Sequence, residues 1–304
     1  MSKDYDVIVV GAGAAGLTAA IYLKRANLNV LVVDKSAPGG EMNMIAEVEN
    51  YPGVLSVDGP TLAMTMFQQV TQLGADFKGT EVLSIEDQGD IKIVHTKKQD
   101  YTCAKVILAT GRKARELGLE NEKSLTGRGV SWCALCDGNF YRDKDIAVIG
   151  GGNSALGESL YLAKLVKSIK LIHRRDTFRA DDYFIQQVLA EPKIEVVYNS
   201  QVTKFIEEDD KLCAIEVVDK IEDQTTTYDV SGCFIYVGYV PETKFVDNLA
   251  ITNDAGYVVV DAHGETSVKG IYAAGDLVQK DVYQIVTATG EGANAAVHVI
   301  ESLK

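Results

Sequence analysis

The chain opens with apolar and polar positions in the pattern of a parallel α/β unit. Residues 5–10 are mostly β-branched and end at Gly11, and residues 17–25 then follow a helical pattern. Residues 29–33 form a second apolar run, which ends at Asp34. A strand, a glycine-rich turn, a helix and a strand that ends in an acid together predict the start of a parallel sheet.

Three further segments extend this first unit. Residues 60–73 place apolar side chains at helical spacing, and residues 80–102 alternate as in a small antiparallel sheet. Residues 104–110 are typical of a buried strand, which ends at Gly111. The stretch 38–53 carries too many turn-forming residues to be one regular element.

A second unit of the same design begins at residue 145. Residues 145–149 predict a strand, and a helix is expected from 154 to about 166, after a glycine-rich loop. The next strand, 169–172, ends at His173. The strand–loop–helix pattern therefore occurs twice in the chain.

The chain then returns to the first unit. The strand predicted at 233–237 echoes the strand at 104–110, so we place the two crossings near residues 113 and 243. A last strand runs into Gly275 and Asp276, and residues 285–303 predict a long helix interrupted by Gly290 and Gly292. The predicted fold class is α/β, with two Rossmann-like dinucleotide-binding domains, the second inserted into the first and joined to it by a two-stranded hinge. The expected domains are 1–113 with 244–304, and 114–243.

Both glycine-rich loops have the spacing that binds a dinucleotide. Residues 11–16 read G-x-G-x-x-G, and residues 150–155 read G-x-G-x-x-A. Glycine lets the backbone approach a pyrophosphate, whose charge the helix N-terminus favours. Asp34 is placed to accept hydrogen bonds from an adenosine ribose, and Asp276, at a strand end, from a ligand hydroxyl.

The second unit is basic where the first is acidic. His173 stands in the place of Asp34, and Arg174, Arg175 and Arg179 follow it. A carboxylate would repel a 2′-phosphate, whereas guanidinium groups pair with one. Two charge-assisted bonds of about 1.5–3 kcal/mol each would favour NADPH over NADH by about two to four orders of magnitude. The alternative is a solvated basic corner.

Cys133 and Cys136 form a C-x-x-C pair just ahead of the second loop. A zinc site would need two more ligands, and the sequence has no second C-x-x-C and no His-x₃₋₅-His, so we expect no metal. A redox pair and two structural cysteines stay open. A redox pair needs an acid to manage the thiol proton, and Asp137 is the candidate. The other three cysteines lie in strand patterns and are expected to be inert: Cys103, Cys213 and Cys233.

Charge and composition narrow the function classes. The chain has 304 residues, a formal net charge of −13 and a pI near 4.8, which argue against nucleic acid and anionic membranes as partners. The uncharged stretch 7–23 is better explained by a strand, loop and helix than by a membrane span. Five scattered cysteines indicate a reducing compartment, and the first residues lack a signal-peptide pattern. We therefore expect a cytoplasmic protein.

Taken together, these motifs resemble those of the low-molecular-weight, bacterial-type thioredoxin reductases, a family of flavin disulfide reductases. The resemblance covers essentially the whole chain. Its motifs lie at residues 11–16, 49–53, 109–111, 127–131, 133–138, 150–155, 173–175, 179–180 and 275–276.

The resemblance implies an oxidoreductase with FAD in the domain built from both chain ends, NADPH in the inserted domain, a homodimer and thioredoxin as substrate. It also implies that the flavin reduces a Cys133–Cys136 disulfide, with Cys136 nearer the flavin, Cys133 attacking thioredoxin and Asp137 as the acid. The inserted domain swings about the hinge in such enzymes, and Arg128 falls in the segment that meets thioredoxin. The implied FAD-binding residues are Gly11, Gly13, Ala14, Ala15, Gly16, Asp34, Lys35, Gly40, Glu41, Asn50, Gly111, Gly275, Asp276, Tyr283, Gln284 and Ile285. The implied NADPH-binding residues are Gly152, Asn153, Ser154, Ala155, His173, Arg174, Arg175 and Arg179.

Four positions depart from the family's usual pattern. Gly157 stands where a glutamate is usual, Tyr283 replaces an arginine, Glu41 replaces a glutamine, and Trp132 places a bulky ring beside the dithiol. A carboxylate at Glu41 would add negative charge near a flavin and lower its potential.

Three other functions are compatible with the same scaffold. The protein would be a reductase with another electron donor such as reduced ferredoxin, a small-molecule dithiol oxidase, or a nucleotide-binding sensor without turnover. The intact basic cluster at 174–179 argues against the first two, and the dithiol beside Asp137 argues against the third.

Overall fold

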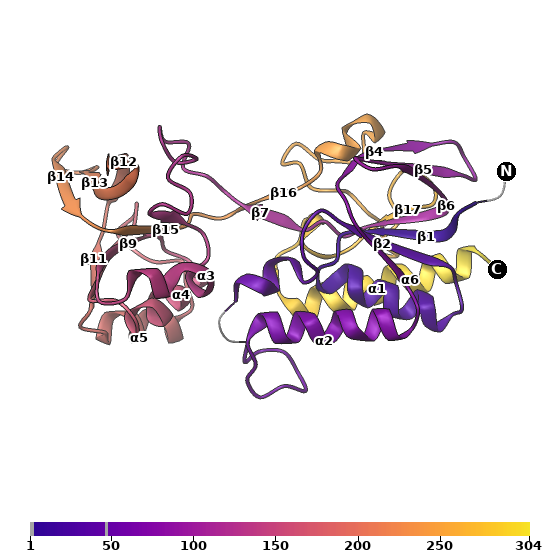
Figure 1. Cartoon of the computed structure of the whole chain (residues 1–304), viewed down its shortest axis with the longest axis horizontal. Coiled ribbons are helices and arrows are strands. Elements are labelled where there is room, and N and C mark those ends of the chain that lie inside the picture. Colours follow the sequence, from indigo (N-terminus) through magenta and orange to yellow (C-terminus); the bar gives the residue numbers. More distant parts are fainter. Residues whose placement is uncertain (1–2, 46–47) are drawn as a thin grey trace. The chain divides into compact units, whose positions relative to one another are not determined.

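The computed structural model describes residues 3–45 and 48–304, and the chain divides into two compact units (Figure 1). The first unit is built from both ends of the chain, up to Lys113 and again from Val240 onward, and the second is Ala114–Tyr239. Each unit has its own sheet of mainly or wholly parallel strands. The predicted α/β fold class is confirmed.

The first unit contains a seven-stranded sheet in the order β3-β2-β1-β6-β5-β4, with β17 also paired to β6. The pairs among β1, β2, β3, β6 and β17 are parallel, and β4 and β5 continue the sheet antiparallel. Its strands are β1 (Tyr5–Val10), β2 (Val30–Asp34), β3 (Asp76–Gly79), β4 (Val82–Asp87), β5 (Lys92–Thr96), β6 (Asp100–Leu108) and β17 (Ile271–Ala273).

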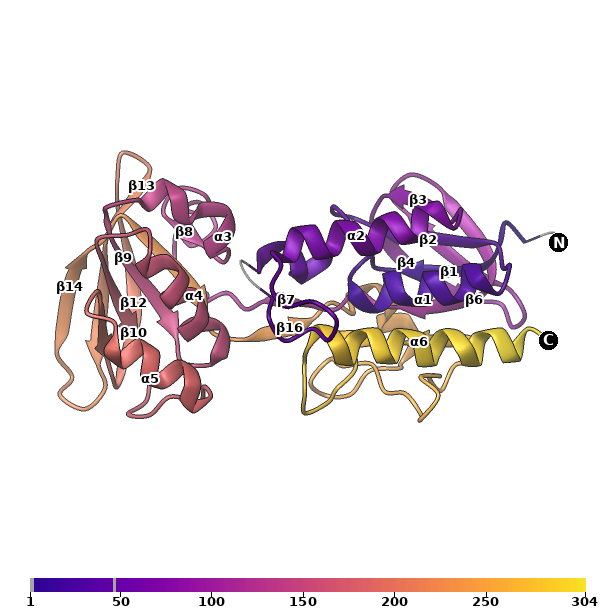
Figure 2. The same ribbon diagram turned by 90° about the horizontal axis from the view of Figure 1, so that it is seen from below.

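Three helices cover one face of this sheet, as Figures 1 and 2 show from two directions. Val7 and Val9 point into the core beneath these helices, whereas Ile8 and Val10 point into a second core on the opposite face. Both faces are covered, which is why the strand is apolar at consecutive positions rather than at alternate ones. The helices are α1 (Ala14–Arg25), α2 (Gly59–Gln72) and α6 (Ile285–Ser302), and short 3₁₀ turns are η1 (Gly40–Met44), η3 (Lys244–Leu249) and η4 (Gly275–Leu277).

The last helix, α6, runs without a break through Gly290 and Gly292, so the expected interruption is wrong. A Cβ atom at Gly292 would lie 2.2 Å from the carbonyl oxygen of Ala15 in α1. The glycine is therefore present because two helix backbones approach closely there, and not because the helix ends.

This contact predicts opposite effects at the two glycines of α6. Gly292→Ala should lower the free energy of unfolding by about 1–3 kcal/mol, because the new methyl group overlaps Ala15. Gly290→Ala is the matched control: a Cβ there meets nothing within 4 Å, and alanine should raise helix stability by about 0.5–1 kcal/mol. Urea unfolding followed by circular dichroism measures both, and equal effects would contradict the packing argument.

The second unit combines a parallel sheet with a small antiparallel one. Its five-stranded sheet has the order β11-β10-β9-β15-β8, and β12, β13 and β14 form the antiparallel sheet. The strands are β8 (Val130–Ser131), β9 (Asp145–Gly150), β10 (Ser168–Ile172), β11 (Ile194–Val197), β12 (Ser200–Glu208), β13 (Lys211–Asp219), β14 (Thr225–Asp229) and β15 (Gly232–Tyr236). The helical segments are α3 (Ala134–Asp137), η2 (Gly138–Tyr141), α4 (Asn153–Ala163) and α5 (Asp182–Ala190).

The chain crosses between the units twice, at β7 (Arg112–Ala114) and β16 (Tyr239–Pro241), and these two strands pair with each other. The second crossing thus falls a few residues before the expected position near 243. Among the helices of the described residues, none has the length and apolar character needed to span a bilayer.

Candidate active site

The dithiol lies at the start of the short helix α3 in the second unit. Cys133 and Cys136 form a disulfide bond, and the Cys136 backbone N–H donates a hydrogen bond to the Cys133 sulfur at 3.0 Å. Cys133 is 5% exposed, whereas Cys136 is exposed. Of the two cysteines, Cys136 is therefore the more accessible residue.

Asp137 is held on the same turn by a residue that the sequence analysis did not single out. The Ser131 hydroxyl donates to the Asp137 carboxylate at 2.6 Å, and the Cys133 backbone N–H donates to that hydroxyl at 3.0 Å. One serine therefore links the candidate acid to the dithiol turn. Ser131 ends strand β8, and no local pattern marks a serine there as a support for an acid.

Two half-buried ionisable groups, Tyr236 and its neighbour Glu158, lie close to this turn. The Tyr236 hydroxyl accepts a hydrogen bond from the Ala134 backbone N–H at 3.1 Å, and burial, with a contribution from the nearby Glu158 carboxyl, raises the pKa of Tyr236 well above its usual range. Burial also raises the pKa of Glu158 to about 7, and one of its oxygens is fully buried without a hydrogen-bond partner in the described part of the chain. A neutral carboxylic acid satisfies such a site better than a carboxylate does.

The second glycine-rich loop is tightly fitted to its unit. Gly150 has a φ of +154°, and a Cβ there would lie 2.4 Å from the carbonyl oxygen of Tyr236. At Gly152, by contrast, a Cβ would meet nothing within 4 Å, so the backbone faces open space at the N-terminus of α4. Close packing on one side and an open helix N-terminus on the other suit a phosphate group.

His173 is turned into the protein. It is 6% exposed, and its two ring nitrogens lie 3.1 Å from the Gly150 carbonyl oxygen and 2.8 Å from the Thr177 carbonyl oxygen. The ring thus braces the glycine-rich loop against the loop that carries the arginines. The side chains of Arg174, Arg175 and Arg179 are all exposed and stay the candidates to pair with a 2′-phosphate.

In the first glycine-rich loop, a carboxylate contacts a backbone N–H, whereas in the second loop an imidazole contacts a backbone carbonyl. A Cβ at Gly16 would lie 1.9 Å from the Gly11 carbonyl oxygen, so this turn requires glycine. The Asp34 carboxylate accepts from the Ala12 backbone N–H at 2.7 Å, where His173 in the second unit faces a carbonyl. At Gly13 a Cβ would meet nothing within 4 Å, which again leaves backbone open beside a helix N-terminus.

Two of the other predicted flavin residues, Gly40 and Gly275, approach this loop from distant parts of the chain. Gly275 packs against Ala15, where an added Cβ would lie 2.8 Å from the Ala15 Cβ, and the Gly40 turn approaches Gly13 at 3.4 Å by the same measure. The Asn50 amide donates to the Gln284 side-chain oxygen at 3.0 Å. The remaining side-chain pairs of this region include Lys35 with Glu242, at 2.6 Å, and Asp276 with Arg112, at 2.8 Å.

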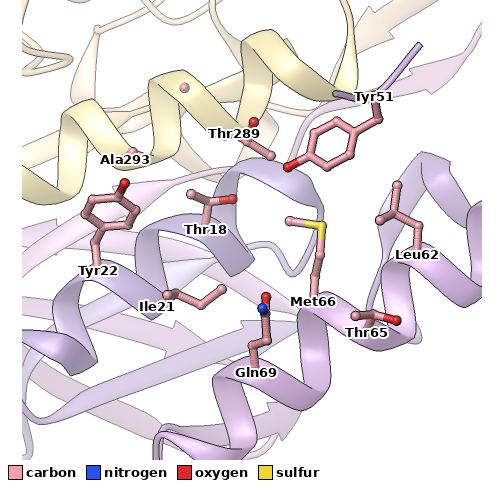
Figure 3. A pocket seen from close by; sticks show the side chains of 11 residues that line it. Thr18, Ile21, Tyr22, Tyr51, Leu62, Thr65, Met66, Gln69, Thr289 and Ala293 are labelled. Carbon is pink, nitrogen blue, oxygen red and sulfur yellow. The ribbon is translucent and has the colours of Figure 1, made fainter. Parts of the chain in front are cut away.

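A separate pocket of about 470 Å³ lies among α1, α2 and α6 of the same unit (Figure 3). Thr18, Tyr22, Tyr51 and Met66 contribute a mixed polar and apolar lining. Among the described residues that line the pocket, none is a predicted FAD-binding residue. The pocket is therefore not part of the dinucleotide site built around Gly13.

With this geometry in place, comparison with known proteins identifies the family. A family model described as pyridine nucleotide-disulphide oxidoreductase matches residues 5–292. The chain belongs to this family. It is 40% identical over 305 residues to a thioredoxin reductase of Bacillus subtilis, and this alignment covers 99% of this chain and 96% of that protein.

Solved structures of the family are similar over the same length. The crystal structure of a Lactococcus lactis thioredoxin reductase gives a TM-score of 0.95 at 40% identity, with 98% of each chain covered. A ferredoxin-flavin thioredoxin reductase from Clostridium acetobutylicum gives a TM-score of 0.54 at 27% identity, with 98% of each chain covered. Similarity is thus greater to the first of these two structures.

The raised pKa of Glu158 predicts a pH-dependent stability. A carboxyl whose pKa rises from about 4.5 to about 7 on folding binds protons more tightly in the folded state. Its contribution to the free energy of unfolding is full below about pH 4.5 and decreases by about 3 kcal/mol as the pH rises to about 7. Glu158→Gln, which stays neutral, should therefore match the wild type at about pH 5 and be more stable at about pH 8.

Urea unfolding followed by tryptophan fluorescence measures this effect, since Trp132 is the one tryptophan of the sequence and lies in the second unit. The exposed Glu120, in the same unit, provides the control Glu120→Gln, for which we expect no pH-dependent gain. Equal behaviour of the two variants would contradict the assignment of a raised pKa to Glu158.

Proposed function

We propose that the chain is an NADPH-dependent thioredoxin-disulfide reductase that carries FAD. The observation that carries this proposal is the Cys133–Cys136 disulfide, which lies on the same unit as a second dinucleotide loop with exposed arginines. Two nucleotide loops and one disulfide provide a donor site, a relay site and an acceptor in a single chain.

Each unit supplies residues that fit one cofactor. In the first unit, residues 1–113 and 240–304 hold FAD, with open backbone at Gly13 for the pyrophosphate and the Asp34 and Asp276 carboxylates for hydroxyl groups. In the second, residues 114–239 hold NADPH at Gly152, with Arg174 and Arg175 for the 2′-phosphate. When bound, the flavin supplies two-electron transfer between the nicotinamide and the disulfide.

The residues of the dithiol turn then carry out proton transfer and thiol–disulfide exchange. Reduction of the disulfide gives two thiols, and Asp137, held by the Ser131 hydroxyl, keeps or returns the proton that one of them exchanges. Cys133 attacks the thioredoxin disulfide, and Cys136 resolves the mixed disulfide. Cys133 is 5% exposed, so it must become more accessible before it attacks. The paired strands β7 and β16 are the proposed hinge between the two units.

The proposal includes the protein's setting. Thioredoxin, or a thioredoxin-like protein, is the disulfide substrate, and the functional form is a homodimer in the cytoplasm. Cys103 and Cys233 support a reducing compartment, because both are fully buried free thiols and burial raises the pKa of Cys103 to about 12.

An anaerobic titration of the flavin-loaded protein tests the proposal. NADPH should bleach the visible flavin absorption rapidly and NADH slowly, and addition of oxidised thioredoxin should restore the absorption. Bleaching by neither nicotinamide would reject NADPH as donor and favour a donor such as reduced ferredoxin. Bleaching by NADPH without reoxidation by thioredoxin would reject thioredoxin as acceptor.

A further inference from the structure

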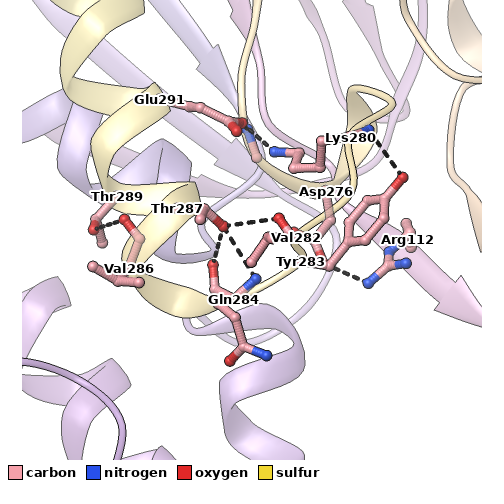
Figure 4. A network of polar contacts seen from close by, with 11 residues as sticks. Arg112, Asp276, Lys280, Val282, Tyr283, Gln284, Val286, Thr287, Thr289 and Glu291 are labelled. Carbon is pink, nitrogen blue, oxygen red and sulfur yellow. Dashed lines mark hydrogen bonds and ion pairs between the residues drawn. The ribbon is translucent and has the colours of Figure 1, made fainter. Parts of the chain in front are cut away.

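Arg112, at the start of strand β7, is held by two residues from the far end of the chain. Its guanidinium donates to the Asp276 carboxylate at 2.8 Å, and its central carbon lies 3.7 Å from the centre of the Tyr283 ring (Figure 4). An ion pair and a nearby aromatic ring together leave a guanidinium little freedom. The group is thus positioned, and not simply a solvated surface charge.

The partners of Arg112 are themselves fixed by a polar network (Figure 4). The Lys280 backbone N–H donates to the Tyr283 hydroxyl at 3.3 Å, and the Lys280 ammonium pairs with Glu291. The same Glu291 oxygen accepts from the Gly275 backbone N–H at 2.8 Å. These contacts hold the segment that carries Asp276, and Arg112 is the cation that pairs with Asp276 itself.

This cluster lies within the proposed flavin site of the first unit. Gly275 packs on Ala15 at the first glycine-rich loop, and Asp276 follows it directly. The side chains of Arg112 and Asp276 are only 15% and 25% exposed. Charges that are partly withdrawn from water interact more strongly with each other and with a bound group than surface charges do.

A second carboxyl group shares the same cation. Glu41 lies on the η1 turn, which approaches Gly13, and its side chain reaches solvent although protein atoms surround most of it. Desolvation raises its pKa to about 7; Arg112 opposes this rise, and Asp276 and Glu242 add to it. Glu242 is paired with Lys35, and Arg112 is the cation that opposes the rise in the pKa of Glu41.

We propose that Arg112 is a positioning residue that holds the Asp276 carboxylate for FAD and, in opposition to Glu41, sets the reduction potential of the bound flavin. The inference rests on the proposed function, because it takes the first unit to be the flavin site. Reduction adds negative charge to the site, which a nearby guanidinium stabilises and a nearby carboxylate destabilises. The two residues should therefore act on the potential with opposite signs.

The test uses the flavin-loaded protein and measures the midpoint potential against a reference dye, together with the dissociation constant for FAD. Arg112→Met should lower the potential and weaken FAD binding about tenfold, the loss expected for one charge-assisted hydrogen bond. Arg112→Lys keeps the charge and should recover most of the potential. The control Arg115→Met makes the same change at an exposed arginine three positions on and should alter neither quantity.

Glu41→Gln gives an independent arm of the experiment. It should raise the potential at about pH 8.5, where Glu41 is ionised, and have little effect at about pH 5, where it is protonated. The double variant with Arg112→Met should lie between the two single variants. If Arg112→Met does not fold, the pH-dependent shift of Glu41→Gln still decides.

Three outcomes are distinguishable. A wild-type protein that binds no FAD would reject the proposed function itself. A wild type that binds FAD, with potentials unchanged in Arg112→Met and Glu41→Gln, would overturn the inference alone. A loss of turnover in Arg112→Met at an unchanged potential would give Arg112 a purely structural role in β7, and would also overturn it.

Discussion

Replacing Cys136 with serine should abolish thioredoxin reduction, by more than about a thousandfold, because residues that act as one catalytic unit cannot be removed singly without losing its chemistry. Without the second sulfur, the disulfide cannot form, so electrons have no path from the flavin to the substrate. Bleaching of the flavin by NADPH should persist, since both nucleotide loops are unchanged. Stopped-flow absorbance and a coupled thioredoxin assay measure the two steps separately.

The matched control is Cys213→Ser. Cys213 is a free, partly exposed thiol in β13, and its loss should leave turnover unchanged. If Cys136→Ser keeps thioredoxin turnover, the C-x-x-C pair is structural. If the wild type itself shows a nucleotide response without disulfide turnover, the protein is a sensor and the serine variant should behave like it.

The double variant Arg174→Ala, Arg175→Ala should raise the KM for NADPH by about two to four orders of magnitude, from the loss of two charge-assisted bonds of about 1.5–3 kcal/mol each. The KM for NADH should hardly change, because NADH lacks the 2′-phosphate. The selectivity for NADPH would then collapse at an almost constant kcat. Both side chains are exposed, so the substitution should not disturb the fold.

Steady-state kinetics with each nicotinamide measure this selectivity, and Arg142→Ala, an exposed arginine elsewhere in the second unit, is the control. A parallel rise of both KM values would point to a disturbed loop, not to a lost phosphate contact. An unchanged KM for NADPH would show that the arginines are solvated surface residues that do not bind the 2′-phosphate. It would favour a ferredoxin-type protein as the electron donor.

The α/β fold class follows from the sequence because its signals are local. The first strand, the glycine-rich turn and Asp34 lie within about thirty residues, and the second unit repeats them. The close approach of Gly16 to the Gly11 carbonyl is a property of one turn, so the residue type alone reveals it. The individual site residues stay predictions, which the variants above test.

What the sequence did not reveal depends on contacts between distant segments. Gly292 suggests a helix break until Ala15 is seen against it, and nothing near Arg112 predicts that Asp276 and Tyr283 will hold its side chain. The inward turn of His173 has the same origin, since its two carbonyl partners are set by the fold of both loops. Local sequence patterns predict which helices and strands form. The burial and the ion pairs of a side chain depend on residues far from it in the sequence, which a local pattern does not include.

The insertion of one unit into the other also sets an order of synthesis. The last residue of the second unit, Tyr239, is synthesised before β17 and α6 of the first unit. Until then α1 lacks the helix that packs on Ala15, and β6 lacks its partner strand β17. Translation therefore completes the inserted domain first, and the surfaces of α1 and β6 that α6 and β17 cover stay exposed until the end of the chain is made.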